Sequence, residues 1–170
     1  MPPSEEMQQE EQDIIWMRHA LSLAQKAFDM GEVPVGAVIV QNNTLLASAH
    51  NLRETKQDPT AHAETLAIQE AAQKIGSWRL EQCTLYVTLE PCPMCAGSLW
   101  LSRIPRCVFG CSDPRSGYLG SIANLMDHPQ LNHHYAITSG VLEEECSEIL
   151  RTFFRRIREE KSTKRRHRQG

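Results

Sequence analysis

Hydrophobic positions follow two different spacings along the first part of the chain. Between residues 14 and 28, apolar side chains recur every three or four positions, which predicts a helix that Asp13 caps and Gly31 ends. The segments 35–41 and 44–51 are rich in β-branched and small apolar residues and are separated by two asparagines, which predicts a β-hairpin. The chain is therefore expected to begin with one helix and two strands.

After this hairpin, helical and strand patterns alternate. Thr60 is placed to cap a helix from Ala61 to about Lys74, and Pro93 suits the first turn of a later helix because its missing N–H needs no partner there. The other predicted elements are three strands, a short helical piece and a long final helix, with the strands at 84–90, 106–111 and 135–138 and the final helix from about Leu142. This alternation predicts an α/β fold with a mostly parallel sheet.

The length of 170 residues and the hydrophobic content of 41% fit one compact domain. We expect that domain at 13–158, with an acidic, disordered segment at 1–12 before it and a basic, frayed tail at 159–170 after it. No apolar run approaches the roughly 20 residues of a membrane span, and the acidic N-terminus differs from a signal or transit peptide. We therefore expect a soluble, cytoplasmic protein without membrane contact.

Charge is distributed unevenly, although the net charge is only −3. Residues 1–13 carry five acids and no base, whereas residues 151–170 carry nine of the 18 lysines and arginines against two acids. The second segment is a candidate contact for a polyanion. A solvated helix end explains the same charges equally well.

The chain has six cysteines, and two of them stand three positions apart in the stretch LEPCPMCAG, as Cys92 and Cys95. Without a secretory signal, a thiol-rich cytosolic protein is favoured over a disulfide framework. A Cys-x-x-Cys pair can be a redox couple, part of a metal site, or two unrelated thiols. We interpret the other four, Cys83, Cys107, Cys111 and Cys146, as buried small hydrophobes.

A second motif, His62-Ala63-Glu64, lies at the predicted start of another helix and favours the metal interpretation. One imidazole and two thiolates give zinc three protein ligands, which leaves the fourth tetrahedral position open for catalysis. A structural zinc site needs a fourth ligand, and no further cysteine or histidine forms a second paired spacing. Glu64, two positions after His62, can handle protons without binding the metal. The combination of His-x-Glu with Pro-Cys-x-x-Cys is the signature of zinc deaminases that act on nucleobases.

Three stretches carry a family resemblance: DPTAHAETLAI (58–68), LYVTLEPCPMCAGSLWLSRIPRCVFG (85–110) and DHPQLNHHYAITSGVLEEECSEILRTFFRRIRE (127–159). They resemble bacterial tRNA-specific adenosine deaminases, and the likeness runs from about Asp13 to about Arg158. The resemblance implies a cytidine-deaminase-like fold, with a central five-stranded mixed sheet flanked by helices. It also implies a homodimer and tRNA as the partner.

The family's reaction converts the wobble adenosine of a tRNA anticodon to inosine. Carried onto this sequence, His62, Cys92 and Cys95 hold one zinc ion per subunit, and Glu64 is the catalytic proton shuttle. Hydroxide activated by zinc attacks C6 of adenine, Glu64 protonates N1 and then the amino group, and ammonia leaves.

Further residues match the family's substrate contacts. By resemblance, Asn51 binds the flipped nucleoside, Asp113 contacts the neighbouring nucleotide, and Asn132 and His133 lie near the anticodon loop. As a less favoured alternative, Asp113 and Asn132 are only turn formers. The basic end of the last helix, including Arg155 and Arg156, is expected to contact RNA phosphates. Four positions depart from the family pattern in this region: Ser112, Tyr118, Asn124 and His134.

Three alternative functions stay open at this point. One is a zinc deaminase of a free base or nucleoside (cytosine, guanine or cytidine), because these enzymes share the metal motif. Another is a catalytically silent RNA-binding module, although the presence of Glu64 argues against it. The last is a redox protein that uses Cys92 and Cys95 as a dithiol.

Overall fold

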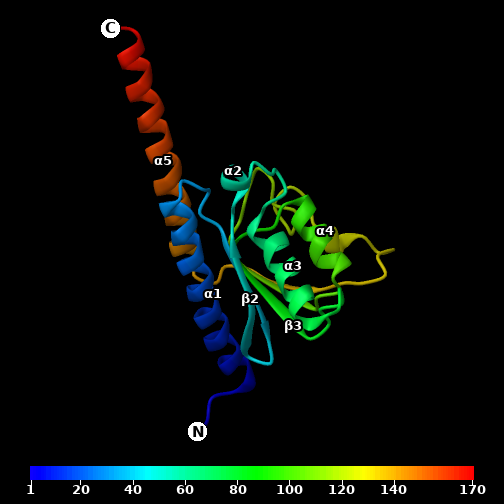
Figure 1. Cartoon of the computed structure of the whole chain (residues 1–170). Helices are drawn as coiled ribbons and strands as arrows, with labels where there is room; N and C mark the ends of the chain where they lie inside the picture. Colours follow the sequence, from blue (N-terminus) through cyan, green and yellow to red (C-terminus); the bar gives the residue numbers. More distant parts are fainter.

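The computed structural model describes residues 1–170, and it is a single sheet with helices on both faces (Figure 1). The long helices are α1 (Glu5–Asp29) and α5 (Glu143–Arg168); the shorter ones are α2 (Arg53–Lys56), α3 (Ala63–Ile75), α4 (Pro93–Leu101) and the 3₁₀ turn η1 (Leu125–Asp127). The strands are β1 (Gly36–Gln41), β2 (Thr44–His50), β3 (Cys83–Leu89), β4 (Arg106–Cys111) and β5 (Ala136–Thr138). No helix combines the length and the hydrophobicity that a membrane span requires.

The sheet has the strand order β2-β1-β3-β4-β5. β1 pairs antiparallel with both β2 and β3, whereas β3, β4 and β5 are mutually parallel. The five-stranded mixed sheet is therefore confirmed. Four of the five strands, β2, β3, β4 and β5, run in the same direction, as expected of a mostly parallel sheet; only β1, between β2 and β3, runs against its neighbours.

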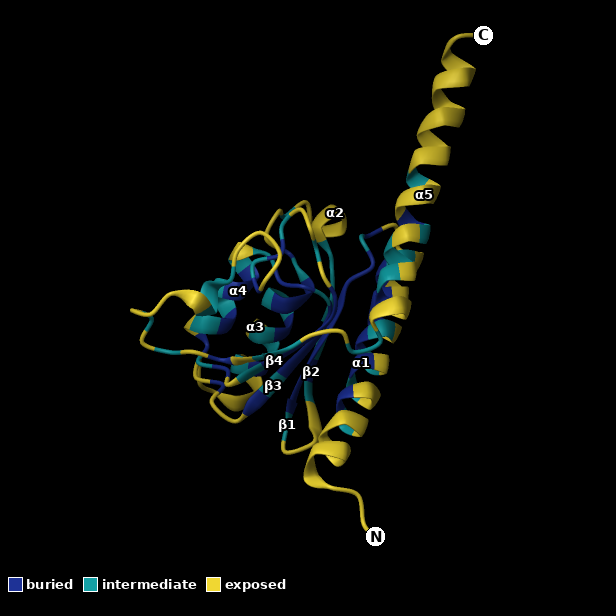
Figure 2. Ribbon diagram, turned by 180° about the vertical axis from the view of Figure 1, so that it is seen from behind, coloured by how far each residue is buried: buried dark blue, intermediate teal, exposed yellow.

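Side chains alternate between the two faces of the sheet, as the pleat of a β-strand requires. Ala37, Ile39, Leu85 and Val87 pack with α3 and α4 in one hydrophobic cluster, while the neighbouring strand residues, among them Val38, face α1 in the other. Figure 2 shows the strands buried between these helix layers, and the outer half of α5 exposed.

The N-terminal helix begins nine residues earlier than expected. Ser4 is its N-cap and accepts a hydrogen bond from the Met7 N–H at 3.2 Å, so Asp13 as N-cap is wrong. Residues 5–12 are helical rather than disordered, and α5 continues through 159–168. Domain limits at 13 and 158 stay a prediction.

Asp13 instead joins α1 to the sheet. Its carboxylate accepts two hydrogen bonds from Arg106, at 2.8 and 2.7 Å, and one from the Tyr86 hydroxyl at 2.9 Å. Arg106 also donates to Thr138 on β5 at 3.0 Å. Burial raises the pKa of Asp13, but the hydrogen bonds from Arg106 and Tyr86 outweigh it, and the pKa is lowered. The ionised carboxylate is therefore a structural group.

Replacing Asp13 with alanine is expected to lower the free energy of unfolding by about 3–5 kcal/mol, because Arg106 then stays half-buried without its counter-charge. Since the pKa of Asp13 is lower in the folded chain than in the unfolded one, its stabilisation is present above the unfolded pKa and is lost as the pH falls through the folded pKa. Urea denaturation at several pH values measures both effects. The exposed Asp29 on the same helix is the control: Asp29→Ala should cost within about 0.5 kcal/mol. Equal losses in the two variants would contradict this role.

The chain topology brings many chain segments to one edge of the sheet. The parallel strands β3 and β4 both end there, and the antiparallel register of β1 places its first residue, Gly36, beside His50 at the end of β2. Ligands of α/β proteins bind at the carboxyl ends of parallel strands. The candidate site lies at this edge.

Candidate active site

His62 and the two cysteines of the Cys-x-x-Cys motif lie together at this edge. His62 is the N-cap residue of α3, Cys92 is the N-cap residue of α4, and Cys95 follows in the first turn of α4. Thr60 as N-cap of α3 is wrong, because it forms a turn with Asp58 instead. Helix N-termini carry a partial positive charge, which favours the thiolate form of both cysteines.

The distances among the three side chains fit a tetrahedral zinc site. His62 Nδ1 lies 3.6 Å from Cys92 Sγ and 3.5 Å from Cys95 Sγ, and the three ligand atoms all lie within 4.8 Å of one another. Zinc bonds of about 2.3 Å to sulfur and 2.0–2.1 Å to nitrogen place the two ligand atoms about 3.6 Å apart at a tetrahedral angle. The donor atoms are therefore spaced as zinc requires, and the three side chains leave a fourth position open.

The pKa values of the two thiols differ in direction. Hydrogen bonds from Cys95 and then from His62 lower the pKa of Cys92 to about 4, although burial opposes them. The hydrogen bond to Cys92 raises the pKa of Cys95, and burial raises it further. Hydrogen bonding to Cys92 raises the pKa of His62 as well. The lowered pKa of Cys92 favours its thiolate form, which is the form that binds a metal ion.

Glu64 lies in the first turn of α3 and is 4% exposed. Burial is the largest cause that raises the pKa of its carboxyl group. Glu64 lines the same cavity as His62 and Cys92, yet it is not one of the three clustered ligand residues. A buried carboxyl group with a raised pKa, beside a metal-type cluster, has the properties of a general acid and base.

The cavity at this edge has a volume of about 800 Å³. Its lining comes from the segment before β1, the segments after β2, β3 and β4, the end of β3, and the helices α2, α3 and α5. The lining residues are Val33, Val35, Asn51, Arg53, His62, Glu64, Leu89, Glu90, Cys92, Ser112, Asp113, Pro114, Arg115, Ser116, Leu150, Phe154, Ile157, Arg158 and Lys161. A nucleotide-sized ligand fits a space of this size.

Comparison with known proteins decides the family. A family model described as MafB19-like deaminase matches residues 11–158. The chain belongs to this deaminase family. It is 52% identical over 156 residues to the tRNA-specific adenosine deaminase of Bacillus subtilis, covering 92% of this chain and 97% of that protein.

Solved structures agree with this assignment. One structure, from a study of A-to-I editing by tRNA:A34 deaminases at the wobble position of transfer RNA, is 39% identical and has a TM-score of 0.77, with 79% of this chain and 98% of that chain covered. A guanine deaminase from Bacillus subtilis is 36% identical, with a TM-score of 0.55, and covers 58% of this chain and 63% of that chain. The expected family and fold class are confirmed.

Two of the predicted substrate contacts, Asn51 and Asp113, line the deaminase cavity. The Asn51 side-chain oxygen accepts a hydrogen bond from the Ala63 N–H at 2.9 Å, so its amide N–H groups are left for a ligand. The carboxylate of Asp113 accepts hydrogen bonds from the N–H groups of Arg115 and Ser116, which makes it a turn former in the structure. Because Asp113 also lines the cavity, its carboxylate can contact a substrate there as well.

The other four predicted contacts lie elsewhere. Asn132 is exposed, and His133 is half-buried with Nε2 2.8 Å from the Ile104 carbonyl oxygen; neither lines the cavity. Arg155 and Arg156 also lie outside the cavity lining. The two basic residues of α5 that do line it, Arg158 and Lys161, were not singled out from the sequence. The available signal was their position four and seven residues after the apolar Phe154, which places all three on one side of the helix.

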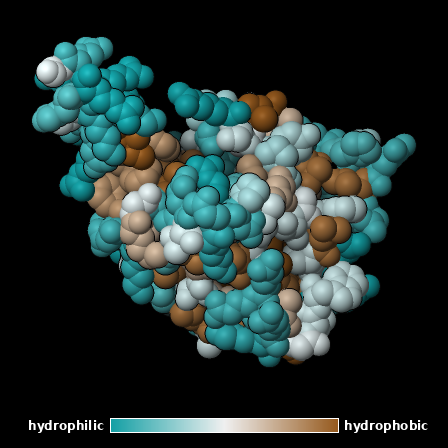
Figure 3. Space-filling view, turned by 45° about the horizontal axis from the view of Figure 1, so that its top comes forward, coloured by the Kyte–Doolittle hydropathy of each residue, from teal (hydrophilic) through white to brown (hydrophobic).

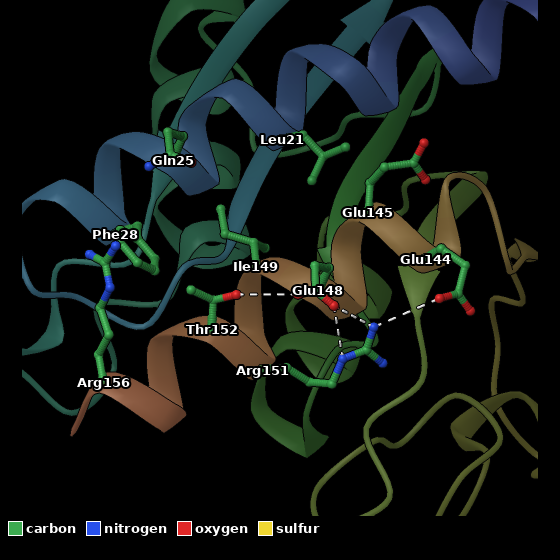
Figure 4. Close-up of a pocket in the computed structure, with 10 residues that line it drawn as sticks. All are labelled: Leu21, Gln25, Phe28, Glu144, Glu145, Glu148, Ile149, Arg151, Thr152 and Arg156. Atoms are coloured by element: carbon green, nitrogen blue, oxygen red, sulfur yellow. Dashed lines mark hydrogen bonds and ion pairs between the residues drawn. The ribbon is translucent and has the colours of Figure 1, made fainter. Parts of the chain in front are cut away.

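Arg156 faces a second space, the open groove between α1 and α5 drawn in Figure 4. Its guanidinium lies 4.8 Å from the centre of the Phe28 ring, as a cation–π pair. Glu148 in the same groove is paired with Arg151 at 2.7 Å. The groove has no His or Cys in its lining, so it offers no counterpart to the ligand cluster around His62.

Glu90, between β3 and the Cys-x-x-Cys motif, organises the loop that follows β4. Glu90 is only 2% exposed. Its carboxylate accepts hydrogen bonds from the N–H groups of Asp113, Leu119 and Ser121 at 3.0–3.1 Å, and from the Ser121 hydroxyl. A Cβ atom at Gly117 would overlap this carboxylate, so the loop can close around it only with glycine there. Glu90 thereby fixes the cavity wall at 112–116, and the sequence pattern had suggested only a strand end.

The positions that depart from the family pattern have separate local roles. Ser112 lines the cavity, whereas the Asn124 side chain caps η1 by accepting from the Met126 N–H at 3.0 Å. The Tyr118 N–H donates to the Pro91 carbonyl oxygen at 2.9 Å, and His134 Nε2 lies 3.0 Å from the His128 carbonyl oxygen. Only Ser112 among them is placed to touch a ligand in the cavity.

Proposed function

We propose that the protein converts the wobble adenosine of a tRNA anticodon to inosine, with zinc held by His62, Cys92 and Cys95. The observation that carries the proposal is the buried Glu64 beside these three ligands, in a chain 52% identical to a tRNA-specific adenosine deaminase. We further propose that the protein works as a homodimer in the cytoplasm.

Zinc bound by this donor set lowers the pKa of a water molecule toward neutrality, which supplies a nucleophile for hydrolysis. Glu64 takes a proton from the attacking water and delivers it to N1 of adenine as the oxygen bonds to C6. Glu64 then takes the second proton of the former water molecule from the oxygen on C6 and passes it to the amino group. The bond between C6 and this nitrogen breaks, ammonia leaves, and inosine remains.

Recognition of the adenosine requires that it leave its base stack, and a single-stranded loop permits this at lower cost than a duplex. The free amide N–H groups of Asn51 bind the flipped nucleoside, and Asp113 on the loop fixed by Glu90 contacts the neighbouring nucleotide. Asn132 and His133 stay proposals for contacts with the anticodon loop. Arg155 and Arg156 stay proposals for phosphate contacts, and Arg158 and Lys161 join them because they line the cavity.

A second candidate is deamination of a free base, which the likeness to the Bacillus subtilis guanine deaminase favours. Offering the purified protein an anticodon stem-loop, free adenosine, cytidine, cytosine and guanine in parallel separates the candidates. The proposal expects inosine in the stem-loop, detected as an A-to-G change after reverse transcription, and much slower turnover of the small substrates. Rapid deamination of guanine with an unchanged stem-loop would overturn it.

Replacing Glu90 with glutamine is expected to raise the KM for the stem-loop about tenfold while kcat and zinc content stay near normal. In the wild type, the N–H groups of Leu119 and Ser121 donate to one carboxylate oxygen of Glu90. In the variant, the glutamine NH₂ group meets N–H donors that have lost their acceptor, and each unsatisfied donor costs about 1–3 kcal/mol. Steady-state kinetics and metal analysis measure the effects. Glu81, exposed before β3, is the matched control, and Glu81→Gln should change neither parameter. A drop in kcat at constant KM in Glu90→Gln would contradict a positioning role.

A further inference from the structure

The short helix α2 forms part of the cavity wall, although it has little of its own to hold it there. None of its four residues is buried, and its N-cap residue, Leu52, makes no side-chain cap hydrogen bond. A single helical turn is not stable by itself in water, because its first N–H groups lack partners within the helix. The end of the molecule that bears α2 comes forward in Figure 3, where hydrophilic side chains make up much of the surface. An acceptor from another segment is therefore needed to hold α2.

Glu32, between α1 and β1, supplies this acceptor. It is only 1% exposed, and its carboxylate accepts hydrogen bonds from the Glu54 N–H at 3.0 Å, the Thr55 N–H at 2.8 Å and the Thr55 hydroxyl at 2.6 Å. The N–H of Glu32 donates to the Ala27 carbonyl oxygen on α1 at 2.9 Å. Burial raises the pKa of Glu32, but the hydrogen bonds from Thr55 and Glu54 outweigh it, and the pKa is lowered. The ionised carboxylate thus ties α2 to the end of α1.

The segment held in this way carries two residues of the cavity lining, Asn51 and Arg53. Arg53 is the first residue of α2, and Asn51 lies two positions before it. Between them, the Leu52 N–H donates to the Ala61 carbonyl oxygen at 3.0 Å. The side-chain oxygen of Asn51 accepts from the Ala63 N–H at 2.9 Å. A displacement of α2 would therefore move both lining residues relative to the start of α3, which carries the ligand cluster's histidine.

We propose that Glu32 is a positioning residue for the deamination: by holding α2, it keeps Asn51 and Arg53 in place to contact the RNA. This inference rests on the proposed function. Glu32 does not line the cavity, so it acts only through α2. A substrate contact that is equally strong before and during the reaction changes KM rather than kcat. Loss of the Glu32 carboxylate is therefore expected to weaken substrate binding and to leave the zinc and the chemistry intact.

Glu32→Gln tests this role, because it keeps the size of the side chain and places an NH₂ group against N–H donors. We expect the KM for the stem-loop to rise about tenfold, with kcat within about twofold of the wild type and zinc content near normal. Hydrogen exchange followed by mass spectrometry should show faster exchange at 51–58 and unchanged exchange at 63–75. Glu54→Gln, the same substitution at an exposed position of α2 itself, is the matched control and should resemble the wild type.

A second pair of variants decides the matter if Glu32→Gln does not fold. Thr55→Val removes only the hydroxyl that donates to Glu32, whereas Thr55→Ser keeps this hydroxyl. We expect Thr55→Val to raise KM about threefold and Thr55→Ser to stay near the wild type, since one of three hydrogen bonds to the carboxylate is lost in the first variant only.

Equal KM values in Thr55→Val and Thr55→Ser, equal effects of Glu32→Gln and Glu54→Gln, or loss of zinc from Glu32→Gln would rule this role out. Fluorescence anisotropy with a labelled stem-loop separates it from the proposed function. If the wild type bound the stem-loop but formed no inosine, the proposed function would fail. Weaker RNA binding by Glu32→Gln and Thr55→Val, with faster exchange at 51–58, would still support the role of Glu32.

Discussion

Replacing Glu64 with alanine is expected to lower the rate of inosine formation by a factor of at least about 10²–10⁴, the usual contribution of a general acid and base. Glu64 is buried in the cavity and lies outside the ligand cluster of His62, Cys92 and Cys95. Its removal therefore takes away the proton carrier and leaves the metal ligands intact. Single-turnover kinetics on the stem-loop, metal analysis and RNA titration together measure the effect.

The matched control for Glu64 is Glu70 on the same helix, whose carboxylate pairs with Lys74 at 2.7 Å on the surface. Glu70→Ala should deaminate at the wild-type rate. Zinc content and RNA affinity of Glu64→Ala should also match the wild type. If Glu64→Ala lost its zinc, Glu64 would be a ligand rather than a proton shuttle, and the proposed chemistry would be wrong.

Replacing Cys95 with alanine should reduce zinc from about one ion per chain to a small fraction and should abolish deamination, because two ligands bind zinc far more weakly than three. Cys95 is fully buried and 3.5 Å from His62 Nδ1, so no other side chain can replace it without rearrangement of α4. Inductively coupled plasma mass spectrometry on protein purified without chelators gives the metal content.

Cys83 provides the control for Cys95. It is a buried free cysteine in the hydrophobic cluster beneath α3 and α4, and burial raises the pKa of its thiol. Cys83→Ala should keep its zinc and its activity, whatever small loss of stability it shows. A full zinc complement in Cys95→Ala would contradict the ligand assignment, and a metal-free wild type with a reversible Cys92–Cys95 disulfide would revive the redox alternative.

The ligand cluster could be predicted from the sequence because each half of it is local. His62 and Glu64 share the start of one helix, and Cys92 and Cys95 share the start of another, so short motifs fix their relative positions. The family resemblance then brings the two halves together. The hairpin and the later strands were also predictable, since short runs of β-branched and other apolar residues, most of them buried in β1, β3 and β4, mark them in the sequence.

Features that depend on distant packing could not be predicted in this way. Asp13 has the residue type of an N-cap, and its partner Arg106 lies on β4, far along the chain. In the sequence, Arg156 and Arg158 are equivalent members of one basic segment. In the structure, Arg156 forms a cation–π pair with Phe28 on α1, whereas Arg158 lines the cavity. Only the packing of α5 against α1 and the sheet decides which side of the helix meets the site.

The central claim is that this site removes the C6 amino group of the wobble adenosine of a tRNA by hydrolysis. Transfer of oxygen from isotopically labelled water into the product tests this claim most directly. The zinc-loaded protein is incubated with an anticodon stem-loop in water enriched in a heavy oxygen isotope, and the RNA is digested to nucleosides for mass spectrometry. The account predicts inosine at the wobble position that carries oxygen from the solvent, formed by the wild type and not by Glu64→Ala. An unchanged adenosine at that position, or inosine formed equally well by Glu64→Ala, would contradict it.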